Sequence, residues 1–249
     1  PEQVSVRVQS GTLLVMLDTQ LTSNTACPEI FEGRTSQVVI IDHHRRGTHS
    51  LEDAAMYCVE PGASSTCELV SEMAQYFGQG IKLPRLDAEA MLAGIYLDTK
   101  SFNINTNSRT FEAAAYLRRQ GADTIKARDF LSDDMNTFIR RSELVRQAVL
   151  LQKGLAYVVL DDLSPAAQLI ASQAADVLAG LRGIRAAFVL YYQGTDILIS
   201  ARSLGAVNIQ LVMEALGGGG HLYMAGAKLK GVTVSQAIEQ LLGAAMAYA

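Results

Sequence analysis

Two short apolar runs in the first half of the chain, residues 13–17 and 38–41, each lead directly into an acidic residue. An uninterrupted apolar run of this length, bounded by polar residues, is typical of a strand that is buried on both faces. If the two strands pair in parallel, their carboxyl ends bring Asp18 to the same sheet edge as Asp42 and His43. Ligands of open α/β sheets bind beyond such an edge.

The segments that follow have helical rather than strand periodicity. Residues 67–77 form an amphipathic run, and its start is marked by a capping box, Ser65 with Glu68 three residues later. Two further helices are predicted over residues 86–97 and 110–120. Apolar strands combined with such helices predict an α/β domain.

The second half of the chain has its own alternation of strands and helices. Two apolar runs on either side of residues 193–196 indicate a hairpin. The predicted strands are residues 155–160, 187–192, 197–201 and 227–232, and the predicted helices are residues 163–181, 208–216 and 233–248. The fold class is therefore α/β, with a first domain over residues 1–122 whose mainly parallel sheet is flanked by helices. A helical linker over residues 123–151 leads to a smaller mixed α/β domain over residues 152–249.

Composition limits the classes of partner. Hydrophobic residues make up 49% of the 249 residues and the formal net charge is −4, without the basic stripe that binds long nucleic acids. No run approaches the roughly 18 apolar residues of a membrane span, so no membrane contact is expected. The three cysteines include no CxxC pair, which favours a reducing, cytoplasmic compartment over a disulfide framework.

The side chains of Asp18, His43 and Asp98 form a candidate metal site. Carboxylate and imidazole donors without a thiolate favour Mn²⁺, Mg²⁺ or Fe²⁺ over structural zinc. A carboxylate such as Asp18 can bridge two ions that activate a water for attack on a phosphoryl group, although three ligands are too few for two ions. The alternative for Asp42, His43 and His44 is an ordinary strand end with a hydrogen-bonded Asp-His pair.

Ser64 and Ser65 lie at a predicted helix N-terminus. Hydroxyl and backbone N–H groups there cap the helix or hold a phosphate, and both can be true.

In the second domain, four consecutive glycines precede His221, and their backbone allows an anion to approach closely. A flexible helix C-terminus is the alternative. Arg202, at the end of a predicted strand, either clamps a phosphate or is a solvated surface arginine. The glycines concerned are Gly217, Gly218, Gly219 and Gly220.

Taken in order, these motifs resemble those of the DHH/DHHA1 phosphoesterase superfamily. Asp42-His43-His44 matches the DHH motif, Asp18 and Asp98 match the acidic motifs before and after it, and the glycine run with His221 is similar to the DHHA1 motif. More specifically, the chain resembles cyclic-di-AMP phosphodiesterases of the GdpP type over essentially its whole length. The matching stretches are Ile41-Asp42-His43-His44-Arg45-Arg46-Gly47, Glu60-Pro61-x-Ala63-Ser64-Ser65-Thr66, Arg109-Thr110-Phe111-Glu112-Ala113-Ala114 and Ser200-Ala201-Arg202-Ser203-Leu204-Gly205.

The resemblance implies hydrolysis of cyclic-di-AMP to linear pApA with two Mn²⁺ ions. By that resemblance Asp18 would bridge both ions, and His43 and Asp98 would hold the second. His44 would contact the scissile phosphate, and Asp42 would orient the neighbouring imidazole.

The resemblance also implies that the glycine run, His221 and Arg202 hold the nucleotide from the second domain. The active site would then lie between the domains, and the protein is expected to form a homodimer.

One departure from the superfamily concerns metal binding. Its motif H-x(3)-D-x-D, which supplies most ligands of the first ion, is absent from the sequence. The start at Pro1 favours a fragment of a longer protein, and any membrane anchor would belong to that parent. The chain as it stands is expected to bind at most one metal ion weakly and to hydrolyse little.

Two alternatives remain open. One is a nanoRNase-type enzyme of the same superfamily, which degrades linear di- and oligonucleotides. The other is a catalytically incompetent nucleotide-binding module that has lost its first metal site. The sequence does not distinguish adenine from guanine.

Overall fold

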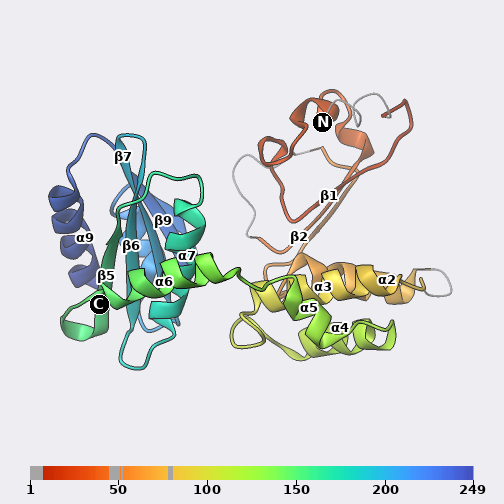
Figure 1. The fold of residues 1–249 in the computed structure, drawn as a ribbon. Coiled ribbons are helices and arrows are strands. Elements are labelled where there is room, and N and C mark those ends of the chain that lie inside the picture. Colours follow the sequence, from red (N-terminus) through yellow and green to blue (C-terminus); the bar gives the residue numbers. More distant parts are fainter. Residues whose placement is uncertain (1–7, 45–50, 52, 78–80, 249) are drawn as a thin grey trace. The chain divides into compact units, whose positions relative to one another are not determined.

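The computed structural model describes residues 8–44, 51, 53–77 and 81–248, so the motif residues Arg45, Arg46 and Gly47 lie outside the described residues. The chain divides into two compact units, Pro1–Ser132 and Asp133–Ala249. Figure 1 gives the helices and strands of each unit.

The first unit contains a three-stranded parallel sheet in the order β1-β2-β3. β1 (Leu14–Leu17) and β2 (Val38–Asp42) are the two predicted strands. Their register pairs Leu17 with Ile41, so their carboxyl ends lie side by side, as expected from the sequence. β3 (Met56–Val59) was not predicted from the sequence; it is an edge strand without a fully buried residue.

Helices account for the rest of the first unit. η2 contributes Phe31 to the core on one sheet face, where it packs with Ile40, and α2 contributes Leu69 on the other face, where it packs with Ile41. The helices predicted over residues 67–77, 86–97 and 110–120 are confirmed within a few residues. The elements are η1 (Thr22–Asn24), η2 (Pro28–Phe31), η3 (Thr35–Gln37), α2 (Thr66–Tyr76), α3 (Arg85–Asp98), α4 (Ser108–Arg119) and α5 (Thr124–Asp129).

Residues 123–151, predicted as one helical linker, form separate elements. α5 belongs to the first unit, whereas α6 (Met135–Arg146) and β4 (Val149–Leu150) belong to the second. The side chains of Asp123 and Asp134 each accept backbone N–H groups at a helix start. The second of these N-caps begins a new helix, which is why the segment is not continuous.

The second unit is built on a six-stranded mixed sheet in the order β4-β5-β6-β7-β9-β8. β5 and β6 are parallel, and the other neighbouring strands are antiparallel. The predicted hairpin is formed by β6 and β7. Besides β4, the strands of this sheet are β5 (Leu155–Leu160), β6 (Ala186–Gln193), β7 (Asp196–Ser203), β8 (Gly219–Gly220) and β9 (Met224–Leu229).

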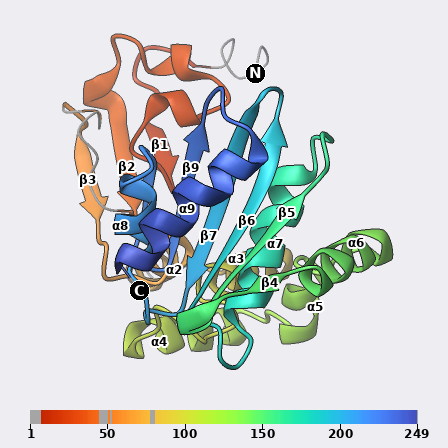
Figure 2. The same cartoon turned by 90° about the vertical axis from the view of Figure 1, so that its left-hand side faces the viewer.

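Helices cover both faces of this sheet, as Figures 1 and 2 show. Successive residues of β6 point to opposite faces: Phe188 packs in the core under α8 and α9, and Val189 packs in the core under α6 and α7. The mixed α/β prediction for this half is confirmed. The helical elements are η4 (Gln152–Gly154), α7 (Ala167–Ala179), α8 (Ile209–Glu214) and α9 (Val234–Tyr248).

Two predicted boundaries in the second unit are wrong. α7 begins later than expected, because Asp162 and Ser164 form a side-chain turn before it. The last strand, expected over residues 227–232, starts instead at Met224 and pairs with the unpredicted β8. No helix in the described part of the chain has both the length and the apolar run that a membrane crossing needs.

Candidate functional site

The adjacent ends of β1 and β2 bring Asp18, His43 and His44 together. The backbone N–H of Asp18 donates to the carbonyl oxygen of Ile41 at 3.0 Å, which keeps the chain beside β2 as it leaves β1. Asp18 has a φ of 64°, in the left-handed region that aspartate enters more readily than most residues. Potential ligand atoms of Asp18, His43 and His44 all lie within 4.8 Å of one another.

His43 lies between two carboxylates from different elements. Its Nε2 is 3.5 Å from Oδ1 of Asp18 and 3.8 Å from Oδ2 of Asp98, the last residue of α3. The three predicted metal ligands are therefore neighbours. Burial raises the pKa of Asp98; the imidazole of His43 opposes this rise, and the negative charge of Asp18 adds to it. A bound cation would relieve the repulsion between the two carboxylates.

The turn after α3 holds the end of that helix in place. Lys100, Ser101 and Phe102 have φ values of 49°, 58° and 66°, an unfavourable left-handed conformation for three successive non-glycine residues. Buried Thr99 stabilises the turn, since its Oγ1 donates to the carbonyl oxygen of Ile95 at 2.6 Å and accepts from the N–H of Phe102 at 2.9 Å. These bonds fix the position of the carboxylate that ends α3.

Asp42 is 1% exposed and orients His44. Its Oδ1 lies 2.7 Å from Nδ1 of His44 and accepts the backbone N–H of the same residue, while Oδ2 accepts from Nε2 of Gln20 at 2.9 Å. Burial alone would raise the pKa of Asp42, but the hydrogen bonds from His44 and Gln20 outweigh it, so this pKa lies below its ordinary value. A carboxylate that accepts from Nδ1 places Nε2 of His44 on the opposite edge of the ring.

The start of α2 differs in part from the prediction. Ser65 is the N-cap and accepts from the N–H of Glu68, as expected. The carboxylate of Glu68, however, accepts from the N–H and hydroxyl of Ser64 instead of the N–H of Ser65, so the predicted capping box is not complete. Both serines are buried, and the residue of this segment that reaches the ligand set is Thr66, which donates to Oδ1 of Asp18 at 2.8 Å.

A hollow of about 310 Å³ opens beside the Asp18 and His44 side chains. Thr66 belongs to the Ser-Ser-Thr run of hydroxyls that the sequence singles out, but its hydrogen bond to Asp18 was not predicted. Gln20 was not predicted at all, and no sequence pattern singles it out. The hollow is lined by Asp18, Thr19, Gln20, Leu21, Asn24, Asp42 and His44.

In the second unit, strand packing explains two of the four glycines in the run, Gly218 and Gly220. Gly219 and Gly220 form β8, which pairs with β9. A Cβ atom on Gly218 would lie 2.2 Å from the carbonyl oxygen of Gly226, and one on Gly220 would lie 2.4 Å from Cα of Ala225. A Cβ atom on Gly219 would meet no heavy atom within 4 Å in the described structure. Gly219 is therefore the glycine of β8 whose lack of a side chain the fold does not explain.

Arg202 and His221 both flank Met224. Arg202 pairs with Met224 in the β7-β9 ladder, and the backbone N–H of His221 donates to the carbonyl oxygen of Met224 at 2.7 Å. The side chain of Arg202 is 11% exposed, and its Nε donates to Oδ1 of Asp176 at 2.9 Å. Arg202 is thus a structured, ion-paired side chain and not the solvated surface arginine of the alternative interpretation.

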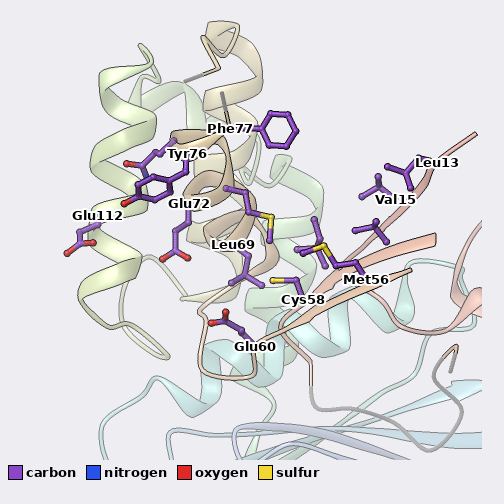
Figure 3. A pocket seen from close by; sticks show the side chains of 14 residues that line it. Leu13, Val15, Met56, Cys58, Glu60, Leu69, Glu72, Tyr76, Phe77 and Glu112 are labelled. Carbon is purple, nitrogen blue, oxygen red and sulfur yellow. The ribbon is translucent and has the colours of Figure 1, made fainter. Parts of the chain in front are cut away.

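A second, larger hollow in the first unit contains none of these site residues. It has a volume of about 870 Å³ and lies between α2 and the face of the sheet that carries Val15 and Met56 (Figure 3). Its walls are mainly apolar, with Glu60 and Glu72 among the lining residues. The candidate chemistry therefore belongs to the smaller hollow.

Comparison with known proteins adds a family assignment for each unit. The DHH family, N-terminal domain, matches residues 1–95, and the DHHA1 domain matches residues 153–249. Cyclic-di-AMP phosphodiesterase GdpP of Geobacillus thermodenitrificans is 44% identical over 242 residues, 97% of this chain and 37% of that protein. Cyclic-di-AMP phosphodiesterase PdeA of Listeria monocytogenes is 40% identical over 249 residues, 100% of this chain and 38% of that protein. The chain thus spans less than two fifths of the length of these relatives.

A solved structure supports the fold. An exopolyphosphatase-related protein from Bacteroides fragilis matches with a TM-score of 0.85 at 19% identity, over 99% of this chain and 74% of that chain.

Proposed function

Because the chain belongs to the DHH family and carries a DHHA1 domain, we propose that it is the catalytic part of a metal-dependent phosphodiesterase that hydrolyses cyclic-di-AMP to linear pApA. One observation carries the proposal: Nε2 of His43 lies within 4 Å of carboxylate oxygens from both Asp18 and Asp98. The names of the relatives at 44% and 40% identity support the choice of substrate.

The donor set fits a divalent cation such as Mn²⁺. Asp18, His43 and Asp98 would hold it, since oxygen and imidazole donors suit this ion and their geometry needs little rearrangement. A pair of such ions supplies an activated water and neutralises charge on the phosphoryl group. Thr66 would keep the Asp18 carboxylate oriented by its hydrogen bond to Oδ1.

The Asp42-His44 pair would act on the phosphate. Asp42 holds Nδ1 of His44, and the opposite edge of the ring would face the scissile diester. From that position His44 would donate a hydrogen bond to a phosphate oxygen. Its half-exposed side chain is accessible to a ligand.

The second unit would bind the nucleotide. Gly219 would let a phosphate approach the backbone of β8, and His221 and Arg202 would lie beside it, near the end of β7 and the start of β9. Gly218 and Gly220 would shape this turn, because each is packed against β9. Ser64 and Ser65 would act indirectly, since their hydroxyls already stabilise the start of α2.

The proposed setting is the cytoplasm, where a cyclic dinucleotide second messenger would be available, and we propose a homodimer as the assembly. Size-exclusion chromatography with light scattering would test the assembly.

The decisive experiment measures Mn²⁺-dependent conversion of cyclic-di-AMP to pApA by this chain and by the protein at its native length. Conversion that is lost in His43→Ala and Asp98→Asn, but kept in Asp87→Asn, supports the proposal. Asp87 is a matched control because it is an exposed carboxylate in the first turn of the same helix as Asp98.

Two other outcomes would redirect the proposal. A strong preference for linear di- and oligonucleotides would favour a nanoRNase-type enzyme. Nucleotide binding without turnover at native length, with metal and fold verified, would favour a binding module.

A further inference from the structure

Gln20 is a buried amide whose two ends have different surroundings. Gln20 is 5% exposed. Its Nε2 donates to Oδ2 of Asp42 at 2.9 Å and to the carbonyl oxygen of His44 at 3.1 Å. A carboxylate and a carbonyl both accept hydrogen bonds, so the nitrogen of the amide must face them. The orientation of this amide is therefore fixed by its partners, and Oε1 must point elsewhere.

Oε1 of Gln20 is buried and has no hydrogen-bond partner among the described residues. Buried acceptors in native proteins are nearly always matched by a donor, and an isolated one commonly indicates a bound water, ion or ligand. The fixed orientation of the amide excludes a simple exchange of its oxygen and nitrogen as the explanation.

The same side chain lines the hollow of the candidate site. Asp18, Asp42 and His44 line it as well, so the unmatched acceptor belongs to a residue beside one proposed metal ligand and the Asp42-His44 pair. In a hydrogen bond an amide oxygen can only accept, so its partner there must be a donor; the other groups that it binds are cations. The non-bridging oxygens of a phosphodiester are acceptors, which excludes them as its partner.

We propose that Gln20 is a ligand-contacting residue of this site, whose Oε1 accepts a hydrogen bond from an O–H group bound in the hollow. This inference rests on the proposed function. Two sources offer the same chemistry: the water that would be attached to the metal, and a ribose 2′-hydroxyl of the nucleotide. Either one completes an amide whose nitrogen already holds Asp42 and His44.

The kinetic test compares Gln20→Met with Gln37→Met in the protein at native length. Methionine keeps the length of the side chain and removes both amide groups. Gln37 is a matched control, because its Oε1 is also buried without a partner among the described residues but it does not line the hollow. We expect Gln20→Met to lower kcat/KM for cyclic-di-AMP about two- to tenfold, which is the effect of one hydrogen bond. Gln37→Met should leave kcat/KM unchanged.

The 2′-deoxy analogue of the substrate separates the two sources. If the donor is a ribose hydroxyl, Gln20→Met removes the preference of the enzyme for the ribose substrate over the deoxy analogue. If both substrates lose the same factor, the loss comes either from the bond to the water or from the lost Nε2 bonds to Asp42 and His44, and the spectroscopic test below decides between them. Equal rates for Gln20→Met and Gln37→Met would overturn the proposal.

A spectroscopic readout keeps the inference independent of turnover. In ¹H–¹⁵N spectra, the side-chain amide signals of Gln20, assigned by their loss in Gln20→Met, should shift when Mg²⁺ and pApA are added. If the wild-type protein does not hydrolyse cyclic-di-AMP, the proposed function fails, and this shift alone decides the role of Gln20. Signals that stay unchanged would then overturn it.

Discussion

Nδ1 of His44 lies 2.7 Å from Oδ1 of Asp42, and Asp42 is almost completely buried. The two residues belong to the same motif: Asp42 is the last residue of β2, and His44 follows two residues later. Its buried carboxylate fixes the imidazole, so the orientation of His44 depends on the charge of Asp42.

Replacing Asp42 by Asn should impair catalysis more than folding. The amide keeps the shape of the carboxylate but can present a donor to Nδ1, which would favour the wrong tautomer of His44. We expect activity to fall by about 10- to 100-fold, as for other residues that orient an active-site imidazole. Steady-state hydrolysis of cyclic-di-AMP by the protein at its native length measures this, with circular dichroism to verify the fold; an unchanged kcat would contradict the assigned role.

Metal binding should depend most strongly on His43, because its Nε2 is near both carboxylates. Titration calorimetry with Mn²⁺ should detect at most one weak site in this chain, abolished by His43→Ala and weakened by Asp98→Asn. Asp87→Asn should bind as the wild type does. Two tight Mn²⁺ sites in this chain would show that the expected ligand set is incomplete.

The glycine run offers a test that separates packing from ligand binding. Gly219→Ala should leave the melting temperature unchanged, since a Cβ atom there meets nothing within 4 Å in the described structure, and should raise KM about tenfold if a phosphate contacts β8. Gly218→Ala should instead destabilise the unit, because its Cβ would lie 2.2 Å from a carbonyl oxygen. Thermal unfolding of both variants, and their KM for cyclic-di-AMP in the protein at native length, decide; an unchanged KM in Gly219→Ala would refute the phosphate contact.

The packing of α2 on α3 depends on Gly94. A Cβ atom at Gly94 would lie 2.4 Å from Sγ of Cys67, so Gly94→Ala should reduce the free energy of unfolding by about 1–3 kcal/mol. Adding Cys67→Ala should restore most of the loss, because the clashing sulfur is removed. Gly243→Ala in α9 is the control, since its Cβ has open space, and it should stabilise the helix by about 0.5–1 kcal/mol. Urea unfolding of the three variants measures these changes; no recovery in the double variant would exclude the Cys67 contact as the cause.

Cys67 should also give the protein a stability that declines at alkaline pH. Burial, followed by the negative charges of Asp98 and Asp18, raises the pKa of this thiol from 9.0 to about 11. Between these values the unfolded thiol loses its proton while the folded thiol keeps it, so the unfolded state binds fewer protons and stability falls as the pH rises. Urea unfolding from below pH 9 to near pH 11 should show that the free energy of unfolding falls more steeply with pH in the wild type than in Cys67→Ala. Equal declines would contradict the raised pKa.

The sequence by itself determined the elements whose signals are local. β1 and β2 could be predicted because each is an apolar run, and α2 could be predicted because Ser65 supplies its own N-cap. The metal-ligand candidates could be found for the same reason, since Asp18 and His43 directly follow the strands that carry them. Parallel pairing of two buried strands then brings these residues to one edge.

Tertiary structure decided the relationships between residues that are distant in the chain. Asp98 reaches His43 only because α3 packs in the first unit and the left-handed turn after Thr99 fixes the end of that helix. The hydrogen bond of Thr66 to Asp18 and the buried amide of Gln20 likewise depend on how segments pack, which no local pattern encodes. Close packing explains the difference: periodicity and capping specify a segment, whereas the contacts between segments depend on the shapes of all the side chains between them.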